Sequence, residues 1–201
     1  MINSARLDPL TSEFRPSEKL TGKITIVVPT FNRYEKLAVL LSFFRSNFPK
    51  ISILVLDSST QKQQLNDVYK DNVTFIEFNP NVGLCEKLLE GVRAVDTPFV
   101  SICADDDFIL PAGTIEAIDF LEKEPTYSVA HGEYLNYQHY PGFRKTVFSH
   151  RYLRESMNSA STNRRLIRHA ENYIPVIYAV HRVENLTIAL ENAFNFASDN
   201  F

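Results

Sequence analysis

Three consecutive aspartates, Asp105, Asp106 and Asp107, directly follow a short apolar run. Adjacent carboxylates repel one another, and burial at the end of a strand raises their pKa values unless a cation compensates the charge. Hard divalent cations such as Mg²⁺ and Mn²⁺ take oxygen ligands, and they commonly bind one or two carboxylates together with substrate phosphates. The triplet therefore predicts a metal–diphosphate site. The alternative is a solvated acidic turn ahead of a helix that begins near Pro111.

Polar segments also follow three other apolar runs, at 29–33, 57–60 and 79–83. The carboxylate of Asp57 and the hydroxyls after it could hydrogen-bond a base or a ribose, or they could form an Asx or Ser turn. The segment that ends at Gly83 opens a predicted helix whose N-terminus would favour an anion, and the alternative is an ordinary helix cap. Lys87 and Arg33 could each reach a phosphate, and a solvent-facing position is the alternative for both.

The elements that must position these side chains alternate in type along the chain. Four short runs, at 24–28, 51–56, 73–78 and 99–103, predict strands, and the β-branched run at 24–28 predicts a buried one. Helical patterns at 33–47, 62–70, 83–94 and 111–124 follow them, and Asn32 is the predicted cap of the first helix. This alternation predicts an α/β fold with a mostly parallel sheet flanked by helices. Because ligands bind beyond the carboxyl ends of the strands in such a sheet, the four polar segments should meet at one edge.

The rest of the chain predicts a smaller antiparallel and helical part. Residues 1–22 show no stable period and predict an irregular lead-in. Antiparallel or edge strands are expected within 126–150, a weak Arg-rich helix at 152–170, an extended stretch at 174–181 and a final helix at 183–196. The chain ends without a helix-stop signal followed by a polar tail, so we expect it to be part of a longer polypeptide.

Composition and charge exclude several classes of protein. The 201 residues are 44% hydrophobic, which is enough for a folded core, and the net charge of −3 argues against a basic nucleic-acid-binding domain. No apolar run is long enough to span a membrane, and no secretory signal is evident at the N-terminus. Cys85 and Cys103 are the two cysteines, and they are predicted to be free thiols in a reducing, cytoplasmic compartment.

The charge is unevenly distributed along the sequence. Residues 141–185 carry 8 basic and 3 acidic residues, whereas residues 1–140 carry 13 basic and 19 acidic ones. The basic stretch could face an anionic ligand, an acidic partner or a membrane surface, and the alternative is an ordinary solvated face.

Three segments together resemble family 2 glycosyltransferases, which have the GT-A fold. Residues 24–33, which read ITIVVPTFNR, resemble the opening strand and loop of that family. Residues 81–83 resemble its Asn-x-Gly helix opening, and residues 105–111 resemble its acidic metal motif, the DXD motif, followed by proline and a helix. The resemblance spans residues 23–125 in order and spacing. Three positions depart from it: Ser58 and Ala104 stand where acids are common, and Lys87 falls in a triplet that commonly contains arginine.

The resemblance implies a metal-dependent, inverting glycosyltransferase of the hexosyltransferase type. Its donor would be a nucleotide-diphosphate sugar, most often a UDP-sugar, and its acceptor a saccharide or lipid-linked hydroxyl. The basic stretch 141–185 could make peripheral contact with a membrane surface that carries a lipid-linked acceptor. Residues 23–125 would form the nucleotide-sugar-binding half and residues 126–201 a truncated acceptor-side half. Asp106 and Asp107 would hold Mn²⁺ or Mg²⁺. The donor-binding candidates are Pro29, Thr30, Asn32, Arg33, Asp57, Asn81, Gly83, Lys87 and Asp105, with Thr30 and Asp57 by the base and Asp105 near the ribose.

The resemblance also implies a carboxylate base in the acceptor half, because inverting members deprotonate the acceptor hydroxyl. Asp199 lies 93 residues after Asp106, just past the last predicted helix, and is the candidate for this role. A terminal residue without a role is the alternative for Asp199, and Glu133 and Glu191 are weaker candidates for the base.

Two other functions remain open, and the sequence argues against three other kinds of site. A nucleotidyltransferase that makes sugar nucleotides would carry a Gly-rich loop after the first strand, and 29–33 contains no glycine. A catalytically incomplete module that only binds a nucleotide sugar is the other alternative. The five histidines lack the close pairing of a zinc site, and the sequence contains neither the P-loop pattern nor the G-x-G-x-x-G dinucleotide pattern.

Overall fold

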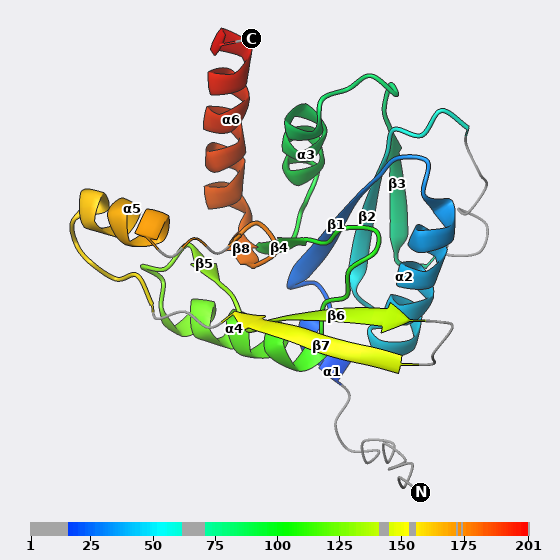
Figure 1. Ribbon diagram of the computed structural model, residues 1–201, viewed down its shortest axis with the longest axis horizontal. Coiled ribbons are helices and arrows are strands. Elements are labelled where there is room, and N and C mark those ends of the chain that lie inside the picture. The colour runs from blue at the N-terminus through cyan, green and yellow to red at the C-terminus, as the bar shows by residue number, and fades with distance from the viewer. Residues whose placement is uncertain are drawn as a thin grey trace, which may run out of the picture.

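The computed structural model of the protein describes residues 16–61, 71–140, 145–152, 156–171, 173 and 175–200 (Figure 1). Its first half contains α1 (Pro16–Leu20), β1 (Ile24–Thr30), α2 (Tyr34–Asn47), β2 (Ser52–Asp57), β3 (Val73–Glu77), α3 (Leu84–Arg93), β4 (Phe99–Ile102) and α4 (Pro111–Lys123). Its second half contains β5 (Val129–Ala130), β6 (Tyr134–Tyr140), β7 (Lys145–Tyr152), α5 (Thr162–Glu171), β8 (Val180–Arg182) and α6 (Val183–Asn200).

A six-stranded sheet in the order β3-β2-β1-β4-β8-β5 forms the centre of the fold. The strands β1 to β4 are mutually parallel, and β8 runs antiparallel to both of its neighbours. Thr30 at the end of β1 is in register with Asp57 at the end of β2, which is in register with Glu77 of β3. The predicted α/β class with a mostly parallel, helix-flanked sheet is confirmed, and the carboxyl ends of the parallel strands open at one edge.

Alternating side chains along the buried strands build a separate core on each face of the sheet. In β1, Ile24, Ile26 and Val28 face one core, whereas Val27 faces the other. The first core is covered by α1, α2 and α4, and the second by α3 and α6. Both layers of helices are visible around the sheet in Figure 1. This period-2 division is what fixes the sheet between its helices.

A glycine lets α3 lie close to the sheet. A Cβ atom at Gly91 would stand 2.4 Å from Cδ1 of Leu56, a residue of β2 that is fully buried. A side chain there would have to displace well-packed core atoms, which commonly costs about 1–3 kcal/mol. The close approach sets the position of the first turns of α3, which carry Lys87 to the edge of the sheet.

The second half of the chain adds a β-hairpin and places β8 antiparallel within the six-stranded sheet. β6 and β7 pair with each other as a separate two-stranded sheet, with a register shift between Asn136 and Tyr137. β8 is held between β4 and β5, and its His181 is buried with Nε2 2.8 Å from the carbonyl of Val176. Burial lowers the pKa of His181, against the effect of its backbone hydrogen bonds. Arg182 donates to the carbonyls of Tyr127 and Leu121, so His181 and Arg182 both bind backbone carbonyls and hold β8 in place.

Several boundaries differ from the sequence predictions. Residues 16–20 form the helix α1 rather than part of an irregular lead-in, because buried Leu20 packs into the first core. The final helix continues to Asn200, so Asp199 lies within α6 and not beyond it. The predicted helix at 62–70 and residues 1–15 lie outside the described residues. No helix in the described part of the chain is both long and apolar enough to cross a membrane.

Candidate functional site

The end of β1 and the acidic turn after β4 are joined by a buried hydrogen bond. Thr30 Oγ1 donates to Asp105 Oδ2 over 2.8 Å, and Asp105 is only 2% exposed. The two side chains meet because β1 and β4 are adjacent and parallel, so their carboxyl ends lie together. Asp107 N donates to the Ala104 carbonyl over 3.1 Å, which closes the turn that carries the three aspartates. The predicted convergence of these two strand ends is therefore present.

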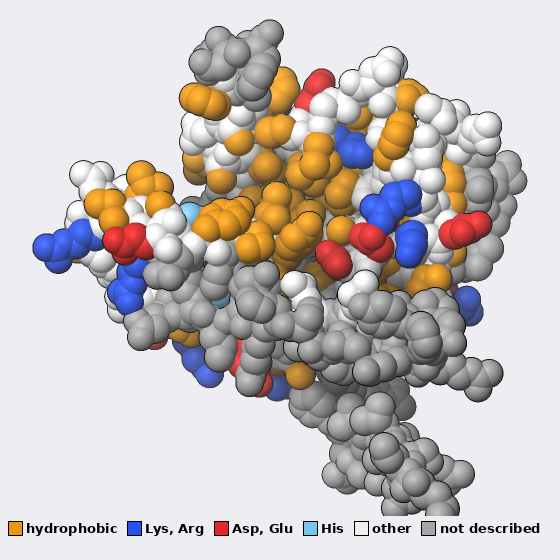
Figure 2. Space-filling view, viewed as in Figure 1, with side chains coloured by type: hydrophobic (Ala, Val, Ile, Leu, Met, Phe, Trp, Pro, Cys, Tyr) orange, Lys and Arg blue, Asp and Glu red, His pale blue; other side chains and the backbone are white. Residues whose placement is uncertain are grey.

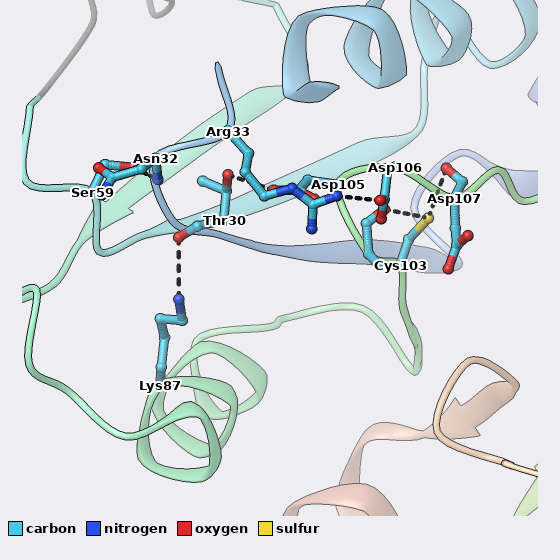
Figure 3. A network of polar contacts seen from close by, with 10 residues as sticks. Thr30, Asn32, Arg33, Ser59, Lys87, Cys103, Asp105, Asp106 and Asp107 are labelled. Carbon is cyan, nitrogen blue, oxygen red and sulfur yellow. Dashed lines mark hydrogen bonds and ion pairs between the residues drawn. The ribbon is translucent and has the colours of Figure 1, made fainter. Parts of the chain in front are cut away.

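Arg33 reaches across from the start of α2 to the same turn (Figure 3). Its Nη1 lies 3.1 Å from Asp105 Oδ1, and its Nη2 is paired with Asp106 Oδ2. The Asp105 carboxylate is buried, whereas the side chains of Arg33 and Asp106 are 46% and 40% exposed. A single guanidinium thus spans two neighbouring carboxylates at the surface of the sheet edge.

Asn32 fixes the loop between β1 and α2. Its backbone has a positive φ of 55°, a conformation that asparagine tolerates better than most residues. Its N–H donates to Ser59 Oγ over 2.8 Å, and its Oδ1 accepts hydrogen bonds from the N–H and Oγ1 of Thr60. The prediction that Asn32 caps the helix is wrong, because the N-cap position is Arg33 and the Asn32 side chain is directed to the loop after β2.

Asp57 closes the other side of the same loop. Its Oδ2 accepts a hydrogen bond of 2.5 Å from Tyr34 Oη, and its Oδ1 accepts one of 2.8 Å from Ser59 N. All three residues are buried. Sequence reasoning missed Tyr34. Its position directly after Asn32 and Arg33, two residues already predicted to bind the donor, was the signal that could have identified it. The Asp57 carboxylate is thus engaged within the protein and holds α2, β2 and the following loop together.

Lys87 lies inside the protein rather than on its surface. It is 5% exposed, and its Nζ donates to the Thr30 carbonyl over 3.2 Å and to Ser58 Oγ over 2.8 Å. Figure 3 shows the side chain extending from α3 to the end of β1. The solvent-facing alternative for Lys87 is wrong, and its charge is placed under the loops that leave β1 and β2.

Burial is the largest influence on the pKa values of the acidic turn. The pKa of Asp105 is raised, chiefly by burial, while the hydrogen bond from Thr30 and the charges of Arg33 and Lys87 act in the opposite direction. The pKa of Asp107 is also raised, first by burial and then by the charge of Asp106. Burial and the three carboxylates raise the pKa of the Cys103 thiol, which lies beneath the turn and donates to the carbonyls of Ala104 and Asp107.

Tyr178 is a second residue that sequence reasoning did not single out. Its pKa is raised by burial and then by the charge of Asp107, so its phenol lies within electrostatic reach of the acidic turn. It belongs to the segment ahead of β8 and is partly exposed, as is Ile177 beside it. Figure 2 shows apolar side chains gathered between α3, α6 and the charged cluster at the sheet edge.

Among the residues that the structure describes, the remaining predicted ones form none of the side-chain contacts given above for the acidic turn. Gly83 is the N-cap position of α3, one turn before Lys87. Asn81 lies two residues ahead of Gly83, and its N donates to Asn79 Oδ1. Pro29 lies within β1, in register with Leu56. The side chain of Asp199 is outside the described part of the structure, and the C-terminal end of α6 projects away from the sheet (Figure 1). Glu191 forms an ion pair with Arg93 at 2.6 Å.

The side chains of the acidic turn fit a divalent cation that would also coordinate a phosphate group of a bound substrate. Within the described ranges, no three His, Cys, Asp or Glu side chains are gathered into a ready-made metal cage. Such a cage is not needed for Mg²⁺ or Mn²⁺, which commonly bind one or two carboxylates, with water and phosphate completing the coordination. Buried Asp105 Oδ1 accepts no hydrogen bond from any described side chain or backbone group, although Arg33 is close. An unsatisfied buried carboxylate oxygen beside exposed Asp106 suits a cation.

Comparisons with known proteins agree with this geometry. Residues 25–186 match the family described as glycosyl transferase family 2. Beta-1,4 N-acetylgalactosaminyltransferase 1 of Mus musculus is 30% identical over 60% of this chain and 22% of its own length. Beta-1,4 N-acetylgalactosaminyltransferase 2 of the same organism is 34% identical over 54% of this chain and 21% of its own length. The chain thus spans about a fifth of the length of these curated relatives.

Solved structures similar to the chain include that of S. aureus TarS 1-349 in complex with UDP-GlcNAc. The likeness has a TM-score of 0.45 and 21% identity, and it covers 51% of this chain and 32% of that one. The family match extends well beyond half of the chain, from the first strand of the sheet into α6, and includes both the acidic turn and the Arg33 loop. The chain therefore belongs to glycosyl transferase family 2, with the GT-A type of α/β fold that its sequence predicts.

Proposed function

We propose that the protein is a metal-dependent, inverting glycosyltransferase that moves a sugar from a nucleotide-diphosphate sugar to a hydroxyl acceptor. The observation that carries this proposal is the acidic turn. Thr30 joins the turn to the end of β1, and Arg33 joins it to the start of α2, at the edge where α/β folds bind ligands. The names of the two mouse relatives support an N-acetylhexosamine donor, and UDP is the nucleotide that we expect.

The donor would lie across the loops that leave β1, β2 and β3. Thr30 and Asp57 would bound the base, although the Asp57 oxygens are engaged by Tyr34 and Ser59 and would act by shaping that loop. Asp105 would lie near the ribose. Asn32 holds the loop after β1, and Pro29 would lie beside the donor near the end of β1. Asn81 and Gly83 would present the N-terminus of α3 to the anionic donor. Lys87 would contribute positive charge from beneath.

Asp106 would hold the divalent cation, and exposed Asp107 would be the second ligand of that cation. Figure 3 shows the Asp107 side chain directed away from Arg33, so it would have to rotate to bind the cation. When bound, Mn²⁺ or Mg²⁺ would neutralise the charge of the departing diphosphate. The protein's own groups orient the donor and hold the acidic turn in place. Asp199 remains the predicted base, which would take the proton of the acceptor hydroxyl as its oxygen attacks the anomeric carbon.

A thermal-shift panel tests the proposal. UDP with Mn²⁺ should raise the melting temperature of the protein, whereas UDP with EDTA should have a much smaller effect, because a ligand stabilises the folded state by mass action. GDP and ADP with Mn²⁺ report the base preference. Equal shifts with Mn²⁺ and with EDTA would contradict metal dependence, and no shift with any nucleotide would contradict donor binding.

A catalytically incomplete nucleotide-sugar-binding module is the second candidate, because α6 leads the predicted base away from the sheet (Figure 1). Nucleotide binding without transfer or donor hydrolysis, measured in the longest natural form of the protein, would favour this second function. A cytoplasmic location stays a prediction, for which the two free thiols are the supporting observation.

The acceptor side includes a helix suited to contact with an anionic membrane surface. No residue of α5 is buried, and Leu166 and Ile167 are 66% and 58% exposed. At helical spacing, these two lie on one side and Arg164 and Arg168 on another, which is the arrangement of an interfacial helix. This surface supports a lipid-linked acceptor, for which we propose peripheral contact through α5.

Sedimentation with vesicles measures this contact. The protein should bind vesicles that contain phosphatidylserine more strongly than neutral ones, and NaCl should weaken the binding. The double substitution Leu166→Ser and Ile167→Ser should lower the affinity at least about tenfold, because each buried aliphatic side chain contributes roughly 1.5 kcal/mol or more. Val39→Ser on α2 is the control, since Val39 is 59% exposed. Equal binding by all variants would exclude α5 as the contact.

A further inference from the structure

The charge of Arg33 is directed at the acidic turn rather than into solvent. The positive φ of Asn32 and the hydrogen bonds from Asn32 to the loop after β2 fix the backbone just before it. Arg33 is also the N-cap position of α2, so its backbone is held by the helix while its side chain remains partly exposed. The side chain can therefore change partners without a change in the fold.

The guanidinium occupies the face that a divalent cation would need. Its Nη1 lies 3.1 Å from Asp105 Oδ1 and its Nη2 is paired with Asp106 Oδ2, so one cationic group spans both carboxylates. Figure 3 shows the side chain lying between Thr30 and Asp106, directly over the turn. A metal ion bound by Asp106 would be repelled by a guanidinium at this distance.

The contact with Asp105 is incomplete. Although Nη1 is close, Oδ1 of Asp105 is buried and accepts no hydrogen bond from the part of the chain that the structure describes. A guanidinium pairs best with one carboxylate or phosphate through two parallel hydrogen bonds, and here it is divided between two carboxylates. A diphosphate at the same edge would offer Arg33 a better-matched partner.

We propose that Arg33 competes with the divalent cation for the acidic turn, and that it exchanges its carboxylate partners for the diphosphate when metal and donor bind. This inference rests on the proposed function, since it requires both ligands at this edge. Arg33 is then a positioning residue that keeps the turn charge-compensated before the ligands arrive. It makes Mn²⁺ binding weak without nucleotide and strong with it, which couples the two binding events.

The substitution Arg33→Gln separates the competition of Arg33 with Mn²⁺ from its binding of the diphosphate, because the two effects change affinity in opposite directions. The variant should bind Mn²⁺ alone at least about threefold more tightly, as measured from the free-ion signal by electron paramagnetic resonance, since the competing ion pairs are lost. It should bind UDP in saturating Mn²⁺ at least about threefold more weakly by calorimetry, since the diphosphate loses a cationic partner. A purely structural role would weaken both.

Lys36→Gln is the matched control, because it removes the same charge from an exposed position in the first turn of the same helix. Its Mn²⁺ and UDP affinities should equal those of the wild type. Arg33→Lys should lie between wild type and Arg33→Gln in Mn²⁺ affinity, since one ammonium cannot span both carboxylates. Melting temperatures of all variants within a few degrees of each other would show that the fold is intact.

The outcomes distinguish this inference from the proposed function. Wild-type protein that binds neither Mn²⁺ nor UDP would overturn both. Wild-type protein that binds both ligands, with an Arg33→Gln variant whose Mn²⁺ affinity is unchanged or lower, would overturn only the role of Arg33. Tighter Mn²⁺ binding together with weaker UDP binding in that variant would establish the exchange.

Discussion

Asp106→Ala should abolish the metal-dependent part of UDP binding while leaving the fold intact. The Asp106 side chain is 40% exposed, and its ion pair with Arg33 is at the surface, so its removal should change stability by less than about 1 kcal/mol. The ion would lose its principal carboxylate, and ligands of this kind are worth several kcal/mol to a metal-bridged diphosphate. Calorimetric titration of UDP with and without Mn²⁺ should show the wild-type difference disappear.

The control for this experiment is Asp96→Ala, which removes an exposed carboxylate between α3 and β4. Its UDP affinity in Mn²⁺ should match that of the wild type. An Asp106→Ala variant that keeps full Mn²⁺-dependent affinity would show that another group holds the ion. A variant that loses UDP binding together with cooperative unfolding would instead assign Asp106 a structural role.

Asp57→Ala should destabilise the protein by about 2–4 kcal/mol, because it leaves two buried donors without their acceptor. These donors are Tyr34 Oη, at 2.5 Å, and Ser59 N, at 2.8 Å. Urea unfolding followed by circular dichroism measures the loss. The variant should also bind UDP more weakly, because Ser59 holds the backbone of Asn32 and, through it, the loop that carries Arg33.

A double-mutant cycle with Tyr34→Phe tests this explanation. Tyr34→Phe alone should cost about 1–2 kcal/mol, and the two substitutions together should cost clearly less than the sum of their separate effects, because they remove the same hydrogen bond. Strict additivity would show that the Tyr34–Asp57 bond contributes nothing to stability.

The sequence predicts the parallel half of the fold well because buried parallel strands appear as short, nearly continuous apolar runs. The runs that become β1, β2 and β4 are almost entirely buried, whereas β3 at the edge of the sheet has no buried residue, and each run is followed by a polar segment. Convergence of Thr30 and Asp105 then follows from the adjacency of β1 and β4, and Arg33 joins them from the loop after β1. The antiparallel hairpin within 126–150 was also predictable, although its boundaries were not.

Side-chain partners depend on distances that a sequence does not contain. Asn32 has the residue type of a helix cap, but the loop after β2 offers its side chain Thr60 instead. Lys87 looks like a surface lysine at helical spacing, and it is buried because Gly91 allows α3 to approach Leu56 of β2 closely. Tyr178 lies beside β4, where Ser101 Oγ donates to its carbonyl, because β8 inserts antiparallel next to that strand.

A crystal structure with UDP and Mn²⁺ bound tests the central claim most directly. The account predicts one ion in contact with the Asp106 carboxylate and the diphosphate oxygens, at the edge formed by the ends of β1, β2 and β4. The guanidinium of Arg33 should have moved from the carboxylates to the diphosphate. UDP bound elsewhere, or an ion that makes no contact with the acidic turn, would contradict the account.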